Sequence, residues 1–365
     1  MRVHWGKESF WVKIGFVFHK NPCQPLVGID IIRLNALTEG LVKRGLHVEI
    51  VAPVKVVGLT SSGIPVHPIA CLQDGGRYDV LKTCYHFSAE LIAEFRGPVV
   101  SRLVRVVDEH LPDRDGVRRS RLLQCQEIIR ERSSAVVFNN RENAERWRRL
   151  YGKPDIIVQI PTGCPDVLPQ EAVSPYDRNE QVILFLGSIV SSRMATMISE
   201  IAEKLQGLAR VHHIGQDKNR LYGNSCPWRI SPLIIQHGEM NEDGIWNYIH
   251  HARLGLAAAP GQHLFDNDLS KIYSYLRGGL RVLSEEYIIN NNLVKNTGWG
   301  SIFRYGDADD AVAKAVSMLA EPVSCHEKER VTSYMAREHA WQNRAARYHE
   351  LFRRLRAEAR KTSPY

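Results

Sequence analysis

The segment DNDLSKIYSYLRGGLRVLSEE, residues 266–286, decides the fold. It predicts a helix followed by a strand, because apolar residues first recur at spacings of three and four and then form the run LRVL. Lys271 lies in the first turn of this helix, where the partial positive charge of the helix terminus disfavours a cation unless an anion binds there. The alternative is a lysine on an ordinary amphipathic helix that extends its ammonium group into solvent.

The first half of the chain alternates strand and helix patterns. VKIGFVF (12–18), IDIIRLNALTEGLVKRG (29–45) and HVEIVAP (47–53) predict a strand, a helix and a strand. Such units form parallel sheets with right-handed crossovers. Further candidate strands are YDVLKTC (78–84), PVVSRLVRVV (98–107), SAVVFNN (134–140) and DIIVQIP (155–161).

The pattern restarts after a Pro-rich, polar stretch at residues 160–181, with VILFLGS (182–188) as its first strand. The sequence therefore predicts an α/β protein of two doubly wound, Rossmann-like domains that face a cleft. We place the first domain at 1–165 and the second at 176–337, with a C-terminal helix in 338–365 that crosses back to complete the first. The crevice at the carboxyl ends of the strands is the expected ligand site.

Composition narrows the classes of function. The chain has 365 residues, of which 44% are hydrophobic, and no apolar run is long enough to span a membrane. Its seven cysteines never form a C-x-x-C pair, which favours a reducing cytoplasm and argues against a structural zinc site. The net charge of +8 allows nucleic acid, an anionic membrane or a phosphorylated substrate as partner. We expect no nucleic acid, because no recognition-helix, zinc or aromatic-basic motif is present.

The order of elements resembles the GT-B fold of nucleotide-sugar glycosyltransferases. HGEMNEDGIWNYIHHARLGLAAAP (237–260) followed by DNDLSKIYSYLRGGLRVL (266–283) is similar to the donor domain of the membrane-associated, xanthan-type glucuronosyltransferase family of polysaccharide biosynthesis. The resemblance implies an inverting transfer of a sugar from a UDP-sugar, which is a substrate, with no cofactor and no obligatory metal. It does not fix the donor sugar, so glucuronate is one candidate. A lipid-linked saccharide acceptor and peripheral contact with the inner face of an anionic membrane are the corresponding expectations.

The donor diphosphate is expected at two turns of the second domain. Lys271 would contact it, and Ser270 would add a hydroxyl donor. Gly187 and Ser188 stand where a strand turns into its helix, and small residues there let the backbone approach phosphate, although close helix packing is the alternative. Arg193 stands about where many GT-B enzymes carry a basic residue near the phosphate.

The nucleoside is expected beside Gly238, Glu239 and Met240. The resemblance implies that Glu239 accepts hydrogen bonds from the ribose or base while Met240 packs on the ring, whereas an isolated loop glutamate is otherwise usually solvated. The motif DND could hold a metal, but we expect Asn267 or Asp268 to cap the helix instead. No metal site is therefore predicted.

The resemblance implies that the first domain binds the acceptor and the second the nucleotide-sugar, so the general base is expected from the first domain. Asp108 and Glu109 directly follow a predicted strand, and a carboxylate there could take the proton of the acceptor hydroxyl. Asp108 is preferred because the family's catalytic aspartate also follows this strand, with a helix cap as the alternative role. His19 and His86 are weaker candidates, since a histidine at a strand end is more often structural.

One departure from retaining relatives bears on stereochemistry. Retaining GT-B enzymes often carry two glutamates around the donor helix, whereas the equivalent residues here are Asp266 and Ser274. The missing second carboxylate favours inversion and places ribose binding on Glu239. Alternative functions are a soluble natural-product glycosyltransferase, a sugar-nucleotide epimerase, and a nucleotide-sugar-binding protein without transferase activity.

Overall fold

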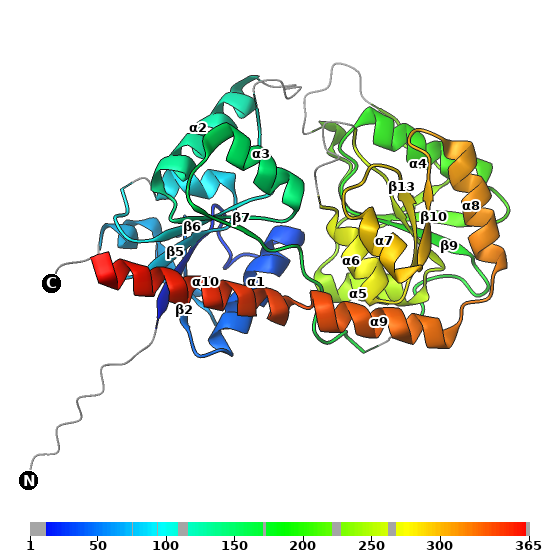
Figure 1. Ribbon diagram of the computed structural model, residues 1–365. Helices are drawn as coiled ribbons and strands as arrows, with labels where there is room; N and C mark the ends of the chain where they lie inside the picture. The colour runs from blue at the N-terminus through cyan, green and yellow to red at the C-terminus, as the bar shows by residue number, and fades with distance from the viewer. Residues whose placement is uncertain are drawn as a thin grey trace, which may run out of the picture.

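The computed structural model describes residues 12–74, 76–92, 94–108, 116–170, 173–220, 228–261 and 268–362. Two α/β units lie side by side, each built on its own sheet (Figure 1). The strands of the first sheet lie between residues 13 and 159, and those of the second between residues 182 and 303. The predicted class, α/β with two Rossmann-like parallel-sheet domains, is confirmed.

The first sheet has eight strands in the order β3-β4-β2-β1-β5-β6-β7-β8 and is parallel except for β3. Its strands are β1 (Lys13–Val17), β2 (His47–Ala52), β3 (Gly58–Leu59), β4 (Pro65–Pro68), β5 (Val80–Thr83), β6 (Val99–Leu103), β7 (Ala135–Phe138) and β8 (Ile156–Gln159). The helices of this unit are α1 (Ile29–Val42), η1 (Ile69–Gln73), η2 (His86–Leu91), α2 (Gly116–Arg132) and α3 (Arg141–Tyr151).

The second sheet has six parallel strands in the order β11-β10-β9-β12-β13-β14. Its strands are β9 (Val182–Leu186), β10 (Arg210–Ile214), β11 (Ile234–Gln236), β12 (Leu254–Ala257), β13 (Arg281–Glu285) and β14 (Gly300–Phe303). The helices are α4 (Ser192–Lys204), η3 (Lys218–Arg220), α5 (Glu242–His251), α6 (Ser270–Arg277), α7 (Asn291–Thr297) and α8 (Ala308–Ala320). The chain enters at the central β9 and returns through β12, so the direction of winding reverses between these two strands. Ligands of doubly wound sheets bind at such a reversal, outside the carboxyl ends of the strands.

Both faces of each sheet are buried, which explains the nearly continuous apolar strands. Along β9, Ile183 and Phe185 enter a core under α4 and α8, whereas Leu184 and Leu186 enter a core with α5, α6 and α9 (Cys325–His339). Because successive side chains of a strand point to opposite faces, an all-apolar strand needs helices on both sides.

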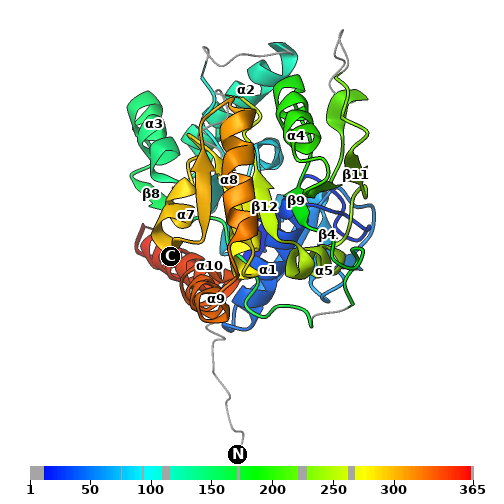
Figure 2. The ribbon, with the colours of Figure 1, turned by 90° about the vertical axis from the view of Figure 1, so that its right-hand side faces the viewer.

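The C-terminal segment joins the two units. α9 packs on α6 of the second unit, and α10 (Trp341–Thr362) packs on α1 of the first, as the orange and red helices of Figure 1 show. Seen from the side in Figure 2, α9 and α10 run along the same face of the molecule as α1. A Cβ on Gly40 of α1 would lie 2.7 Å from Cβ of Ala345, so the glycine permits close contact between α1 and α10.

The linker after β8 is bonded to α6 at both ends of that helix. Thr162 N donates to the Asp268 carboxylate (3.3 Å), and Arg277 donates to the carbonyl oxygens of Pro165 and Asp166 (2.9 Å each). The helix-capping role expected for Asp268 is wrong, because Leu269 is the N-cap residue and makes no side-chain capping bond. The Asp268 carboxylate is used for the linker instead, and Asn267 lies outside the described residues.

The strand expected at residues 98–107 is shorter than predicted, since β6 ends at Leu103. Beyond it, Val106 N donates to Asn143 Oδ1 (2.8 Å) and Val107 N donates to Gln126 Oε1 (2.7 Å). Amide side chains of α2 and α3 thus replace the neighbouring strand as partners.

Among the described helices, none combines the length and apolar character needed to cross a bilayer.

Candidate functional site

Three glycines form a row at the carboxyl ends of β9, β10 and β11. Gly187, Gly215 and Gly238 all have positive φ, and Gly215 N donates to Gly238 O (2.8 Å). A Cβ on Gly215 would lie 2.4 Å from Gly187 O, so only glycine permits this approach of the two backbones. Beneath the row, His213 Nε2 donates to Gly187 O (2.9 Å). Sequence reasoning missed Gly215, although a glycine directly after a strand was the available signal.

Lys271 lies beside this row, in the first turn of α6 as predicted. Its Nζ lies 3.7 Å from the centre of the Phe185 ring and 3.7 Å from where a Cβ on Gly187 would be. Because Leu269 provides no side-chain cap, the first amides of α6 also keep hydrogen-bonding capacity. The predicted pairing of Lys271 with the turn after β9 is therefore present in the structure.

The charge of Lys271 has no counter-ion in the described part of the chain, where no hydrogen bond or ion pair to its ammonium group is found. The side chain is half-buried, and burial lowers the pKa of Lys271 to about 7. The face of the Phe185 ring offers weak attraction without neutralising the charge. An anion that binds here would restore the protonated state of the lysine.

Tyr275 fixes α6 against the sheet. Its hydroxyl donates to Leu184 O (2.9 Å) and accepts from Leu186 N (2.8 Å), so the helix is bonded to the backbone of β9. A Cβ on Gly255 of β12 would lie 2.5 Å from the Tyr275 ring, so the strand glycine makes room for the tyrosine. Sequence reasoning missed this positioning residue, although a glycine inside an apolar strand signals close approach.

The residues predicted to hold a nucleoside lie after β11. Glu239 is exposed and accepts a hydrogen bond from Gln216 Nε2 (2.6 Å), which follows β10. Met240 is partly buried and packs at the start of α5, near Gly244. The Glu239 carboxylate and the Met240 thioether thus lie at the same edge of the sheet as Gly238. Their role in nucleoside binding stays a prediction.

The three predicted serines flank Lys271 and Gly187. Ser188 is half-buried in the short turn between β9 and α4. Ser270 is the first residue of α6, and Ser274 lies one turn later on the same side of the helix. All three belong to the two segments that carry the lysine and the glycine row.

Arg193 lies over the ends of β12 and β13. Its guanidinium donates to Ala259 O (2.6 Å) and to the buried carboxylate of Glu285, and it lies 4.0 Å from the centre of the Tyr305 ring. The structure does not bring this group against Gly187, so its contact with phosphate stays a prediction. Glu285, which sequence reasoning missed, also accepts from Ala259 N (2.8 Å) and Gly306 N (3.0 Å).

The predicted base Asp108 is the last described residue before 116, and Glu109 lies outside the described residues. Val107, which precedes it, is bonded through both backbone groups to the Gln126 amide (2.7 and 2.8 Å). Asp108 is near enough to Tyr151 of α3 to contribute to the raised pKa of that tyrosine, which burial chiefly causes. The structure thus places Asp108 on the side of α2 and α3, and its catalytic role stays a prediction.

His19 lies at the carboxyl end of β1. Its ring is stacked on Tyr85, with centroids 5.4 Å apart, and burial lowers its pKa. Its buried Nδ1 has no hydrogen-bond partner among the described residues. His86 differs, because its Nε2 is bonded to Arg105 O (2.9 Å) and the side chain is buried. His86 is therefore fixed inside the protein, whereas His19 is partly exposed.

A cluster of buried cations at the same edge of the first sheet was missed by sequence reasoning. Lys82 and Arg102 are each 1% exposed, and both bond to backbone next to the end of β5. Arg33 lies in α1, where it is paired with Asp30 (3.2 Å), and burial lowers its pKa to about 10. A charged residue inside an apolar strand, as in YDVLKTC, was the available signal.

No metal cluster is found in the ranges that the structure describes, since no three His, Cys, Asp or Glu side chains there could hold an ion together. Asp266 and Asn267 of the DND motif lie outside those ranges. The prediction that the chain needs no metal is therefore left to experiment.

Comparisons with known proteins show which solved structures share this fold. No protein-family model and no curated protein sequence matches the chain. Among solved structures, sucrose-phosphate synthase from Thermosynechococcus elongatus aligns with a TM-score of 0.74 at 14% identity, over 95% of this chain and 100% of that one. HepE from Anabaena, solved with UDP and glucose, aligns with a TM-score of 0.73 at 12% identity, over 93% and 99%.

A third similar structure is WaaG, a glycosyltransferase involved in lipopolysaccharide biosynthesis, with a TM-score of 0.59 at 13% identity, over 93% of this chain and 99% of that one. Identities this low establish similarity of fold alone, and the alignments span nearly the full length of both chains. The chain therefore has the two-domain GT-B fold of these glycosyltransferases.

Proposed function

We propose that this protein is a glycosyltransferase that moves a sugar from a UDP-sugar donor to an acceptor hydroxyl. The observation that carries the proposal is the position of Lys271. Its ammonium group has no carboxylate partner in the described chain and lies beside Gly187, where the winding of the second sheet reverses. A half-buried cation without a counter-ion, next to an uncapped helix terminus, is suited to a diphosphate.

The donor would lie along the carboxyl edge of the second sheet. Glu239 and Met240 would contact the nucleoside, while Lys271, Ser188, Ser270 and Ser274 would contact the diphosphate and its linkage to the sugar. Gly187 and Gly238 would let the backbone approach the donor. The HepE structures with UDP and glucose and with UDP-glucose share this fold and support the choice of donor class.

The transfer would need no metal, because protein groups would offset the charge of the leaving diphosphate. Negative charge grows on the diphosphate as the glycosidic bond breaks, and preorganised cations and amides stabilise such charge. Lys271 and the first amides of α6 would supply both. Arg193 would join them if its guanidinium turned away from Glu285.

Asp108 would accept the proton of the acceptor hydroxyl, in a single displacement that inverts the anomeric carbon. Support for inversion is the absence of a glutamate at Ser274, where retaining relatives carry their second one. His19 is the second candidate base, because it is partly exposed and follows the carboxyl end of β1.

For the acceptor, we propose a lipid-linked saccharide at the cytoplasmic face of a membrane, with glucuronate among the candidate donor sugars. The net charge of +8 and the resemblance to xanthan-type enzymes support this choice. A natural-product transferase in solution would not sediment with anionic vesicles, so sedimentation separates the two. A binding protein without transferase activity would bind the donor and release no UDP.

The experiment combines binding with turnover. Calorimetric titration with UDP, UDP-glucose, UDP-glucuronate and GDP-mannose should show binding of UDP and of at least one UDP-sugar, and Lys271→Ala should weaken that binding strongly. The matched control is Lys295→Ala, which removes an exposed lysine from the last turn of the neighbouring α7. Tight binding of UDP by Lys271→Ala, or no binding of any UDP compound by the wild type, would contradict the proposal.

A further inference from the structure

Two tyrosines follow β13 and β14, the last two strands at one side of the second sheet. Tyr287 comes two residues after β13, and Tyr305 two residues after β14, so both lie at the carboxyl edge that also carries Gly187. Their ring centroids are 6.2 Å apart, with an angle of 66° between the planes. Tyr287 is exposed, on the far side of β12 from the glycine row.

Tyr287 is held in an uncommon conformation. The residue is 59% exposed, and its backbone has a φ of 65°, in the left-handed region that large side chains rarely adopt. Such strain persists only where the surroundings fix it, and it concentrates at functional sites. The surroundings here include Glu285, which bonds to Ala259 N and Gly306 N and so joins the loops after β12, β13 and β14.

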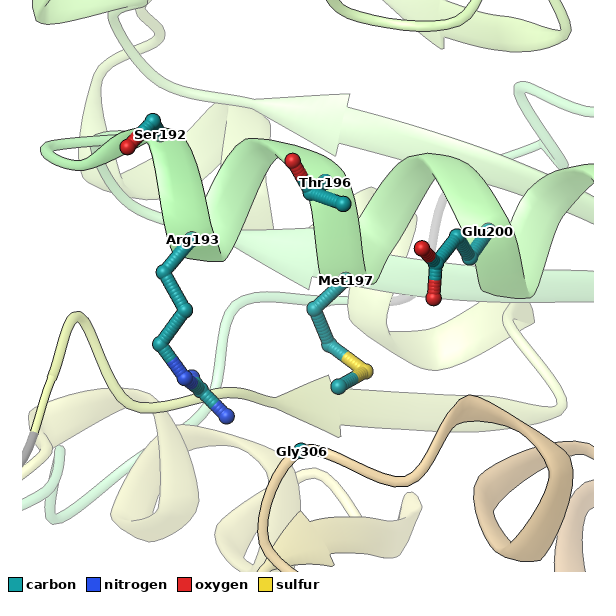
Figure 3. Close-up of a pocket in the computed structure, with 6 residues that line it drawn as sticks. All are labelled: Ser192, Arg193, Thr196, Met197, Glu200 and Gly306. Atoms are coloured by element: carbon teal, nitrogen blue, oxygen red, sulfur yellow. The ribbon is translucent and has the colours of Figure 1, made fainter.

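A cavity of about 320 Å³ adjoins the tyrosine pair through Arg193, whose guanidinium lies 4.0 Å from the Tyr305 ring centre. Figure 3 shows Arg193 and Met197 extending from one side of α4 toward Gly306. The remaining lining residues carry hydroxyl or carboxylate groups: Ser192, Thr196 and Glu200. The cavity volume lies at the lower end of the range for small-molecule sites, roughly 300–1,000 Å³.

We propose that Tyr287, Tyr305 and this cavity form a saccharide-binding platform that holds sugar rings of the acceptor. A pyranose ring has an apolar face of C–H groups, which packs on an aromatic ring, and a rim of hydroxyls that needs polar partners. The exposed ring of Tyr287 offers the first, and Ser192, Thr196 and Glu200 offer the second.

The order of strands supports this placement. The nucleoside and diphosphate would occupy the ends of β11, β10 and β9, and the platform lies on the other side of β12, at β13 and β14. It is therefore positioned for groups beyond the diphosphate. The assignment of the saccharide to the acceptor rests on the proposed function, whereas the saccharide chemistry rests on the platform itself.

The test measures saccharide binding without any transfer. The wild-type protein is titrated with cellobiose, maltose, mannobiose and chitobiose, observed by saturation-transfer NMR, with the open-chain polyol sorbitol as the negative control. At least one disaccharide should bind, and Tyr287→Leu, which removes the aromatic face, should weaken its binding at least fivefold. Tyr287→Phe keeps the ring and should bind within twofold of wild type.

The control variant is Leu208→Ala, since Leu208 is exposed on the same unit but follows α4 at the opposite edge of the sheet. UDP affinity should be unchanged in Tyr287→Leu, and saccharide binding should survive in Lys271→Ala, so failure of the platform and failure of the donor site are distinguishable. The platform is overturned if no disaccharide binds, if sorbitol binds equally well, or if Tyr287→Leu binds as tightly as wild type.

Discussion

The ammonium nitrogen of Lys271 lies 3.7 Å from the centre of the Phe185 ring. Phe185 belongs to β9 and Lys271 to α6, so the contact joins the strand that precedes Gly187 to the helix that follows β12. An aromatic face attracts a cation but cannot neutralise it. The pair therefore orients the lysine while leaving its charge available to a ligand.

Lys271→Ala should lower turnover by roughly a hundredfold or more, the scale seen when one preorganised charge-stabilising donor is lost. Loss of the charge should raise the barrier for departure of the diphosphate while the fold stays intact. UDP release from the donor in the presence of acceptor measures the rate, and circular dichroism checks the fold. Lys295→Ala is the control, and near-normal turnover of Lys271→Ala would return Lys271 to an ordinary surface role.

UDP affinity should depend on pH through Lys271. Burial lowers its pKa to about 7, so the free protein carries the charge below pH 7 and loses it above. A bound diphosphate favours the protonated lysine, so binding above pH 7 must take up a proton, and affinity should fall by up to about tenfold per pH unit between pH 7 and 9. Calorimetry in buffers of different ionisation enthalpy would measure this uptake. A pH-independent affinity, or equal proton uptake by Lys271→Ala, would exclude the lysine as its source.

Activity should survive excess EDTA, because protein groups would carry the charge stabilisation that a metal otherwise supplies. The assay compares initial rates before and after dialysis against the chelator. Complete loss that magnesium or manganese restores would show the prediction to be wrong and would direct attention to Asp266 and Asp268 as ligands.

Asp108→Asn should keep UDP affinity but lower turnover by about a hundredfold to ten-thousandfold, because the amide cannot accept the proton of the acceptor hydroxyl. His19→Gln is the parallel variant, and a comparable loss in it alone would make the histidine the base. NMR of the first-formed product should show the anomer opposite to that of the donor. Retention of configuration would remove the single displacement from consideration.

Tyr275→Phe should destabilise the protein by about 1–3 kcal/mol, because Leu186 N would be left buried without its partner. UDP affinity should also fall, since the hydroxyl holds the helix that carries Lys271. Chemical denaturation and UDP titration measure the two effects. Tyr334→Phe is the control, because its partly exposed hydroxyl makes only a long contact of 3.4 Å with His339. Equal stability of the two variants would contradict the positioning role.

Helices and strands with a regular spacing of apolar residues could be predicted from the sequence. Residues 12–53 appear as β1, α1 and β2, and Lys271 lies in the first turn of its helix, because apolar spacing and turn residues suffice to specify such elements. The strand at 98–107 was overestimated because its last residues bond to side chains distant in sequence. No local pattern shows that Asn143 and Gln126 will compete for those amides.

The residues of the candidate site also fall into two groups, those with a local sequence signal and those that depend on distant contacts. Lys271 and Gly187 could be found from a helix start and a strand end, which are local signals. The side chains of Tyr275 and Glu285 make hydrogen bonds that span 19 to 92 residues of sequence, and only the folded chain brings their partners together. Asp268 was misjudged for this reason, since its partner Thr162 is 106 residues away.

The bond between Asp268 and Thr162 has a mechanical consequence. The linker between the two units and the helix that bears Lys271 share one carboxylate, and Arg277 ties the far end of the same helix to the same linker. Rotation of one unit against the other would therefore pull on α6 along its whole length. A change in the angle between the two units would thus also change the position of the Lys271 ammonium group.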